Sequence, residues 1–272
     1  MRFIAPARDA IDPVVFDRPP LDDWADYRDL LADSDWPDIA LLNARRDRSD
    51  RPLFVTQTRQ LEVENLHYEL RIAQRGEIAT RERNWHDLLN AMIWLRFPEL
   101  KSALNKRQVE EIAIAGPKTR TRAQYALTHF DEAGVIVIIR ERRLLDAWDA
   151  HDWHRLFWRE RDAWLNGNAR VIVFGHALLE HALSPAQLLV GKAITVFEDD
   201  AAFQSAADIS RRVAHEIETG SVLADPQAMR PLPLSGIPGW HAENTSETFY
   251  ETAPCFRPLR PGRIYPPPLR SD

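Results

Sequence analysis

The amino-acid sequence predicts an α/β protein in which a three- to four-stranded mixed or parallel sheet is flanked by helices. Short apolar runs, which are typical of buried strands, occur near residues 134–140, 170–174 and 191–197. Segments with helical spacing separate these runs, and such alternation favours a parallel or mixed sheet with covering helices. From about residue 225 onward the chain is rich in proline instead.

These observations divide the chain into three regions. Residues 1–50 form a helical N-terminal extension, rich in Asp, Arg and Pro, with one short helix at 21–33. Residues 51–220 form the main α/β domain. Residues 221–272 form an irregular proline-rich C-terminal strap, and we expect neither a strand ladder nor a helix there because proline lacks the backbone donor.

The first elements of the main domain are read from local signals. The stretch "LFVT" predicts a fourth strand near 53–57, and the helix predicted over 63–76 stops at Gly76. Asn84 is a good N-cap for the next helix, which Pro98 should end.

The second half of the main domain alternates helices with the three apolar strands. A helix at 119–134 leads into the first strand, and an aromatic helical stretch at 141–167 follows it. Helices at 176–183 and 201–220 follow the other two strands. The side chains of Trp153, Phe157 and Trp164 share one helical face, so we expect them in the core rather than in a ligand site.

Composition excludes several classes of protein. A chain of 272 residues, 44% hydrophobic, can bury a full core, and its net charge of -6 argues against a general nucleic-acid or anionic-membrane binder. The single Cys255 excludes an internal disulfide framework and a cysteine-rich zinc site. The N-terminus lacks the apolar segment of a secretory signal, and no apolar run is long enough to span a bilayer. We therefore expect a cytoplasmic protein.

Common catalytic motifs are missing from the sequence. It contains no Walker-type or dinucleotide-binding glycine loop, no G-x-S-x-G and no H-E-x-x-H. Ser184 directly precedes a proline and Cys255 lies in the strap, so neither resembles an activated nucleophile. A covalent mechanism is not expected.

Three polar clusters stand at the ends of predicted elements: "NWHD" at 84–87, "THFDE" at 128–132 and "GHALLE" at 175–180. On a helix, residues four apart share a face, so His176 aligns with Glu180 and His86 with Asn90. Imidazole and carboxylate groups together bind zinc, iron or manganese, and they also form acid/base pairs.

Roles follow from these residue types. His86 and His176 are candidate ligands of a divalent metal cofactor and, with Asp131 and Glu180, candidate catalytic groups. The further candidates for holding a ligand are Arg81, Asn84, Asn90 and Glu132. The structural alternative remains open: His176 caps its own helix, Glu180 is a surface residue, and the carboxylates at 131 and 132 cap backbone amides.

Three stretches together resemble a known bacterial family: "RGEIATRERNWHDLLNAMIWLRFPELKSALN", "RAQYALTHFDEAGVIV" and "VIVFGHALLEHALSPAQLLVGKAI". The family is domain of unknown function 3025, and the resemblance covers roughly residues 50–220. It implies a soluble bacterial protein and carries over no catalytic assignment.

The leading functional hypothesis is a hydrolase-type enzyme that uses the His/carboxylate groups, with or without a metal, on an unidentified small molecule. The alternatives are a non-catalytic module that binds a small ligand or a protein, and, ranked last, a nucleic-acid-binding protein in which Arg120, Arg122 and the arginines of 140–143 follow a phosphate path. No membrane partner is expected.

One geometric prediction separates function from the structural alternative. His176 follows a strand's C-terminal end, where ligands bind in open α/β sheets. We predict that the rings of His86 and His176 face one cleft, within about 10 Å of each other, with Asp131, Glu132 or Glu180 between or beside them.

Overall fold

The computed structural model describes residues 3–46, 52–198 and 204–270, and its centre is a mixed β-sheet. Strands lie in the order β4-β3-β5-β6, with the short β7 also paired to β5. Their bounds are β3 (Gly134–Ile139), β4 (Ala169–Val173), β5 (Val190–Phe197), β6 (Arg230–Pro233) and β7 (Leu269–Arg270). β3 runs parallel to β5 and antiparallel to β4, and β6 is antiparallel to β5. The predicted α/β class and mixed sheet are confirmed.

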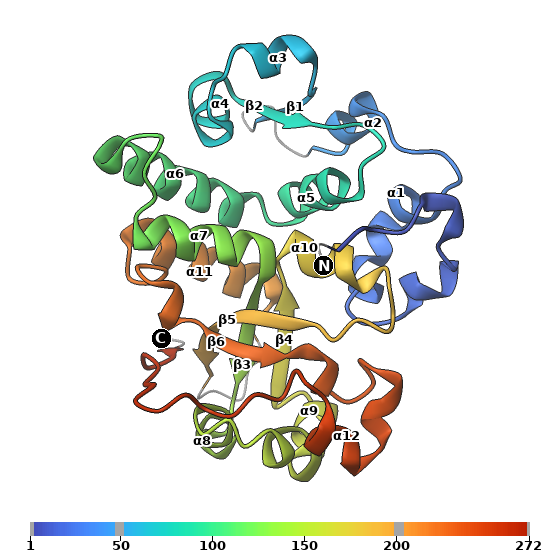
Figure 1. Ribbon diagram of the computed structural model, residues 1–272, viewed down its shortest axis with the longest axis vertical. Helices are drawn as coiled ribbons and strands as arrows, with labels where there is room; N and C mark the ends of the chain where they lie inside the picture. The colour runs from blue at the N-terminus through green and yellow to red at the C-terminus, as the bar shows by residue number, and fades with distance from the viewer. Residues whose placement is uncertain (1–2, 47–51, 199–203, 271–272) are drawn as a thin grey trace.

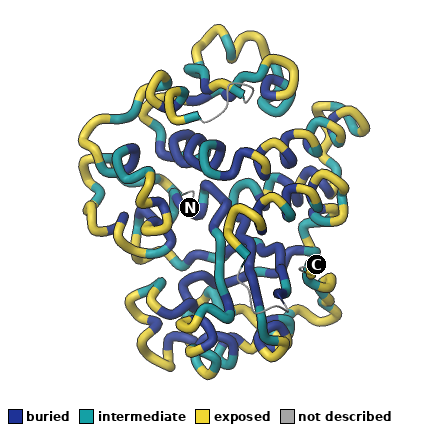
Figure 2. Tube along the Cα trace, turned by 180° about the vertical axis from the view of Figure 1, so that it is seen from behind, coloured by how far each residue is buried: buried dark blue, intermediate teal, exposed yellow. Residues whose placement is uncertain are grey.

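β3 is the core strand, because every one of its six residues is buried. It lies between β4 and β5, and helices α7 (Arg122–Ala133) and α8 (Arg142–Asp149) both pack against it. A strand covered on both faces is apolar throughout rather than alternating, which explains the run "GVIVII". Figure 2 shows the dark buried trace concentrated on this sheet and the helices above it.

Four of the helices above the sheet in Figure 1 surround the polar clusters, and three of them carry a cluster. They are α5 (Trp85–Arg96), α6 (Pro98–Ala115), α7 and α10 (His176–Ala182). As predicted, the Asn84 side chain caps α5 by accepting from the Asp87 amide (3.0 Å). α5 ends at Arg96, just before Pro98, as predicted. Pro98 is also the first residue of α6, where its missing N–H costs nothing.

The predicted fourth strand belongs to a different sheet. β1 (Leu53–Thr56) pairs in parallel with β2 (Glu77–Thr80), and these two strands form a separate sheet at the top of Figure 1. Helices α3 (Arg59–Val63) and α4 (Tyr68–Arg75) connect them. The expectation of a single sheet was wrong here, because β2 has little apolar signal and was not recognised as the partner of β1.

The N-terminal segment is helical, as predicted. It contains three 3-10 turns, η1 (Arg8–Ala10), η2 (Pro13–Asp17) and η3 (Asp22–Tyr27), followed by α1 (Arg28–Ala32) and α2 (Ile39–Ala44). The side chains of Leu21, Trp24 and Leu31 are buried in the common core. The expected region boundary at residues 50 and 51 lies outside the described residues, as do the first residues of the helix predicted at 201–220.

The aromatic stretch after β3 forms α8, a π-helical turn at Arg155–Arg159 and α9 (Arg161–Leu165). Its side chains of Trp153, Phe157 and Trp164 are buried, as predicted. The helix after β5 is α11 (Ala206–Thr219), which ends at Gly220. No helix in the described part of the chain is long and apolar enough to cross a membrane.

The proline-rich segment is more regular than the sequence indicated. It contributes β6 and β7 to the sheet and forms α12 (Glu247–Thr252), so the expectation of neither ladder nor helix was wrong at these three elements. β6 is tolerated because it is an edge strand, where a proline without an amide leaves no neighbour unpaired.

Candidate functional site

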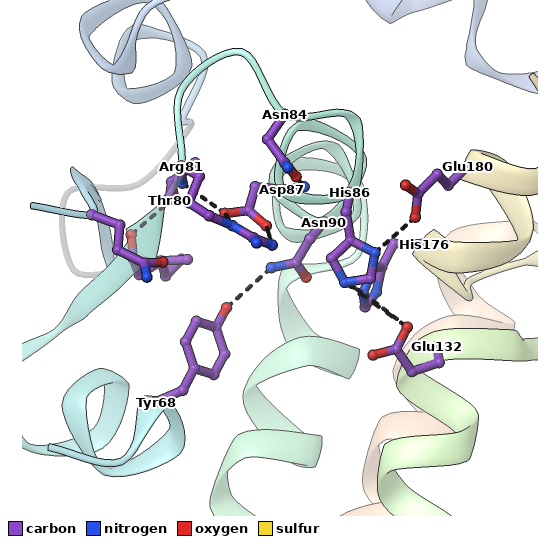
Figure 3. Close-up of polar contacts among 12 residues, drawn as sticks. Tyr68, Thr80, Arg81, Asn84, His86, Asp87, Asn90, Glu132, His176 and Glu180 are labelled. Atoms are coloured by element: carbon purple, nitrogen blue, oxygen red, sulfur yellow. Dashed lines mark hydrogen bonds and ion pairs between the residues drawn. The ribbon is translucent and has the colours of Figure 1, made fainter. Parts of the chain in front are cut away.

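His86 and His176 meet in one cleft, which confirms the geometric prediction. His86 is the second residue of α5 and His176 the first of α10, and their ring centroids are 4.4 Å apart. The two Nε2 atoms face each other at 3.0 Å, as Figure 3 shows. Two nitrogens at this distance share a proton or a bound ion.

The position of the cleft differs from the expected one. β4 is antiparallel to β3, so His176 lies beside the beginning of β3 and not at the C-terminal edge of parallel strands. The Gly175 amide donates to the Gly134 carbonyl (2.8 Å). A Cβ at position 175 would stand 2.6 Å from the Glu132 carbonyl oxygen and the Ala133 Cα. Only glycine allows this approach, which brings α10 against the last turn of α7.

Two glutamates approach the histidines from different sides. Glu132 Oε2, at the end of α7, lies 3.4 Å from Nε2 of His176 and 4.0 Å from Nε2 of His86. Glu180 Oε2, one turn along α10, lies 2.9 Å from the other ring nitrogen of His86, Nδ1. Among the described residues, His86, Glu132 and His176 form a group whose ligand atoms are close enough together to hold a metal ion.

The two imidazoles have opposite electrostatic environments. The hydrogen bond to Glu180 is the main cause that raises the pKa of His86 above its ordinary value. Burial lowers the pKa of His176 to about 3, so this ring is neutral at physiological pH. The Nδ1 atom of His176 is buried and has no hydrogen bond of normal geometry. The nearby Asp131 backbone partly opposes the lowering of this pKa. Burial also raises the pKa of Glu132.

A buried ion pair lies beside the histidines. Lys101 Nζ, on α6, contacts Asp131 Oδ1 at 2.5 Å and Asn90 Oδ1 at 2.8 Å. The Asn90 amide in turn donates to the Tyr68 hydroxyl (3.0 Å). Burial alone would raise the pKa of Asp131, but the Lys101 ammonium together with the two histidines outweighs burial and holds that pKa below its usual range. Asp131 is therefore an ionised carboxylate paired with Lys101.

Apart from Glu180, these groups line one cavity of about 370 Å³. Its wall includes His86, Glu132 and His176, the Lys101 network and, from α4 and α6, Glu69 and Asn105. Glu69 Oε2 accepts from the Asn105 amide at 2.6 Å. Burial by the surrounding protein raises the pKa of Glu69 to about 7, although the cavity leaves its side chain partly accessible. A polar cavity with several perturbed groups is characteristic of a small-molecule site.

Two predicted ligand-binding residues have structural partners. The Asn84 side chain caps α5 and does not line the cavity, so its role is to begin the helix that carries His86. Arg81 lines the cavity but its guanidinium makes a two-pronged pair with Asp87 (2.7 and 3.0 Å). Asn90 and Glu132 line the cavity.

The arginines of the nucleic-acid hypothesis do not form a continuous free row. Arg142 pairs with Asp146 (2.9 Å), and Arg143 with Glu141 (2.6 Å). Arg122 makes a two-pronged pair with Asp225, whereas Arg120 lines the cavity of the histidines. Such pairing leaves less charge for phosphates.

Sequence reasoning missed the contribution of α6. Lys101, Asn105 and Gln108 are buried polar residues, spaced four and three apart, and all three line the cavity. This spacing places them on one helical face. The signal was present in "PELKSALNKRQ", but it becomes visible only when Pro98 is taken as the first residue of a helix.

Comparison with known protein families gives one match for this chain. The family model described as "Protein of unknown function (DUF3025)" matches residues 53–260. This match covers most of the chain, so the protein belongs to that family, and every residue of the histidine cavity lies within it. No curated protein and no solved structure matches the chain.

Proposed function

We propose that this DUF3025 protein is a metal-dependent hydrolase whose ion is held by His86, Glu132 and His176. One observation carries the proposal: the three ligand atoms stand 3.0, 3.4 and 4.0 Å apart. The circle through three such points has a radius of about 2.1 Å, which is the length of a zinc–nitrogen or zinc–oxygen bond. An ion at its centre would meet all three atoms without movement of the backbone.

The protonation of the rings supports the same assignment. The Glu180 carboxylate accepts a hydrogen bond at His86 Nδ1, and this places the ring proton there. The Nε2 atom then carries a lone pair directed at the proposed ion. A carboxylate that orients a ligating histidine in this way is the usual support of a protein metal site. Glu180 is thus proposed as a positioning residue rather than as an acid/base group.

Two nitrogens and one carboxylate are ligands that suit zinc, iron or manganese. With three protein ligands an ion keeps an open coordination position, and there it supplies Lewis-acid chemistry: it polarises a substrate oxygen or lowers the pKa of a water. The chain's own residues provide the rest of the site. Asn90, Tyr68 and Asn105 offer neutral hydrogen-bonding groups along the cavity wall for a polar substrate.

Glu69 is the proposed proton-transfer group. A general acid or base works best when its pKa lies near the working pH, and the pKa of Glu69 is raised to about 7. The two carboxylates expected from the sequence are less suitable, because Asp131 is tied to Lys101 and Glu180 to His86. Glu69 lies in the same cavity, and its side chain accepts a hydrogen bond from the neutral Asn105 amide.

The first test is the metal content of the protein, purified without an affinity tag and measured by plasma mass spectrometry. We expect about one zinc, manganese or iron per chain, and loss of that metal in His86→Gln, Glu132→Gln and His176→Gln. Glu180→Gln should keep the site but weaken the affinity by about 10- to 100-fold. His181→Gln is the matched control, because this neighbouring histidine of α10 contacts Phe3 instead. Failure to take up any of the three metals after reconstitution would contradict the proposal.

The second test separates an enzyme from a binding module. The protein is assayed with chromogenic substrates of three classes: nitrophenyl esters of carboxylic acids, nitrophenyl phosphates and nitroanilides. A hydrolase should show turnover that chelation removes and that Glu69→Gln lowers by about 100-fold while the metal stays bound. Metal binding without turnover on any of these classes would favour the non-catalytic alternative.

A further inference from the structure

A second cavity, of about 560 Å³, lies between the sheet and the C-terminal segment. Four cationic side chains line it: Lys192, Arg257, Arg260 and Arg263. No aspartate or glutamate is among its described lining residues. We call it the cationic cavity. Its charge contrasts with the whole chain, whose net charge is -6.

The sequence brings these cations together through a strand and a turn. Lys192 lies on β5, directly opposite Pro231 of β6. The stretch Arg260-Pro-Gly-Arg263 forms a β-turn in which the Arg263 amide donates to the Arg260 carbonyl (3.1 Å). Proline in the second position and Gly262 at φ 74° in the third are the signature of a type II turn. The turn sets two arginines at its two ends.

The C-terminal segment is fastened to the body of the protein at this place. The Arg257 carbonyl accepts from Trp153 Nε1 (2.7 Å) and from His151 Nδ1 (3.1 Å). The other nitrogen of His151 accepts from the Tyr265 hydroxyl at 2.9 Å. In Figure 1 the red segment crosses beneath β6 on its way to the C-terminus. The arginines are therefore presented from an anchored backbone.

The neighbouring carboxylates are already engaged with other cations. Asp225 is held by Arg122, with both contacts at 2.7 Å, and Asp149 by Arg230 at 2.6 and 3.2 Å. In the described part of the chain, none of the four cavity cations has an ion pair. Burial, followed by the positive charges of the three arginines, lowers the pKa of Lys192. Arg263 also attracts Asp225 electrostatically, but four cations against this one shared carboxylate leave an excess of positive charge, which attracts an anion.

We propose that the cationic cavity binds a small organic phosphate. Arginine forks match phosphate oxygens in pairs, and a lysine adds a point charge. The rest of the wall suits an organic group, because Leu188, Val190 and Met229 supply apolar surface and Tyr265 an aromatic ring. The volume falls within the range of ligand pockets, about 300–1,000 Å³. This assignment is independent of the proposed hydrolase site.

The test is isothermal titration of the full-length protein with ADP, and with inorganic pyrophosphate as the phosphate group alone. We expect saturable 1:1 binding of ADP, with weaker binding of pyrophosphate because it leaves the apolar wall uncovered. Lys192→Gln and Arg260→Gln should each weaken ADP binding by about tenfold, the effect of losing one charge-assisted hydrogen bond. Thermal melts without ligand verify that the variants fold.

The matched control is Arg211→Gln, which removes the same charge from α11, where Arg211 pairs with Asp208. Equal weakening in this variant would show a general charge effect and overturn the proposal. So would the absence of saturable ADP binding, or binding only of a random-sequence oligonucleotide. Pyrophosphate binding as tight as that of ADP would overturn the role of the apolar wall.

Discussion

The two cavities of this protein differ in how their charged side chains are arranged. Around the histidines, buried charged groups pair with groups of opposite charge, as Lys101 pairs with Asp131 and His86 with Glu180. In the cationic cavity four positive groups converge and the nearest carboxylates pair elsewhere. The first arrangement holds itself together without a ligand, whereas the second repels itself until an anion arrives. Substitutions of a cation should therefore have opposite effects on stability in the two places.

The largest expected effect is at Lys101. Lys101→Met keeps most of the side-chain volume but leaves the Asp131 carboxylate buried without its cation. Breaking a buried pair in this way costs about 3–5 kcal/mol of unfolding free energy, measured by urea denaturation. The exposed Lys106 of the same helix, 3.7 Å from Glu218, provides the control Lys106→Met, which should cost less than about 1 kcal/mol.

A double variant distinguishes pairing from packing at this position. Lys101→Met combined with Asp131→Leu removes both charges, and we expect it to regain at least half of the lost stability. If the double variant is no more stable than the single one, the Lys101–Asp131 pair does not stabilise this part of the fold. The contrast in charge between the two cavities would then not explain their stability.

Glu69 is the exception within the histidine cavity, because among the described residues no cation pairs with it. Its pKa is raised from 4.5 to about 7, so the folded state binds this proton more tightly than the unfolded chain does. Its contribution to stability is present below about pH 4.5 and is lost as pH rises to 7. The free energy of unfolding should fall by about 1–3 kcal/mol over this range. This is less than the pKa shift alone would give, because solvent in the cavity screens the carboxylate. Urea unfolding across this pH range measures it.

Glu69→Gln removes the titrating group and should flatten this part of the stability curve. The control is Glu62→Gln, at an exposed glutamate outside the cavity. The assignment is refuted if wild type and Glu69→Gln lose equal stability between these pH values.

Gly175 tests whether close backbone approach shapes the histidine cavity. In Gly175→Ala the new methyl meets backbone atoms of residues 132–134 at 2.6 Å, and these cannot turn away as a side chain could. We expect about 1–3 kcal/mol of destabilisation together with at least tenfold weaker metal binding, because His176 moves away from Glu132. In the control, Gly191→Ala, the methyl meets only Val135 side-chain atoms. That variant should be destabilised without a change in metal affinity.

Sequence patterns predicted the parts of the fold that depend on local periodicity. Apolar runs predicted the strands near 134–140, 170–174 and 191–197, which are observed within one residue of these bounds. The meeting of His86 with His176 was predicted as the condition for a functional site. The apolar signals are strong because a strand buried on both faces must be apolar throughout. The antiparallel pairing of β4 with β3 was not predictable, since pairing direction depends on contacts between distant segments.

The missed parts depend on context rather than on local pattern. β2 is short and only partly buried, so its apolar signal is weak, and its pairing with β1 required the helices between them. β6 contains two prolines, which are acceptable only at a sheet edge. Lys101 was missed because a lysine on a helix is usually solvated, and its burial depends on Asp131, thirty residues away. The four cations of the second cavity are likewise separated in sequence and meet only in the fold.

The smallest expected effect is also the one that distinguishes the two cavities most directly. Lys192→Gln removes a cation that burial and three neighbouring arginines disfavour. In contrast to Lys101→Met, it should leave the ligand-free protein unchanged or more stable, by about 0.5 kcal/mol, because self-repulsion falls. Added ADP should then stabilise the wild type more than the variant, since a ligand stabilises in proportion to its affinity for the folded state. Thermal melts with and without ADP measure both quantities. A Lys192→Gln protein that is clearly less stable without ligand would mean that this lysine has a stabilising partner, and that the charge of the cationic cavity is balanced.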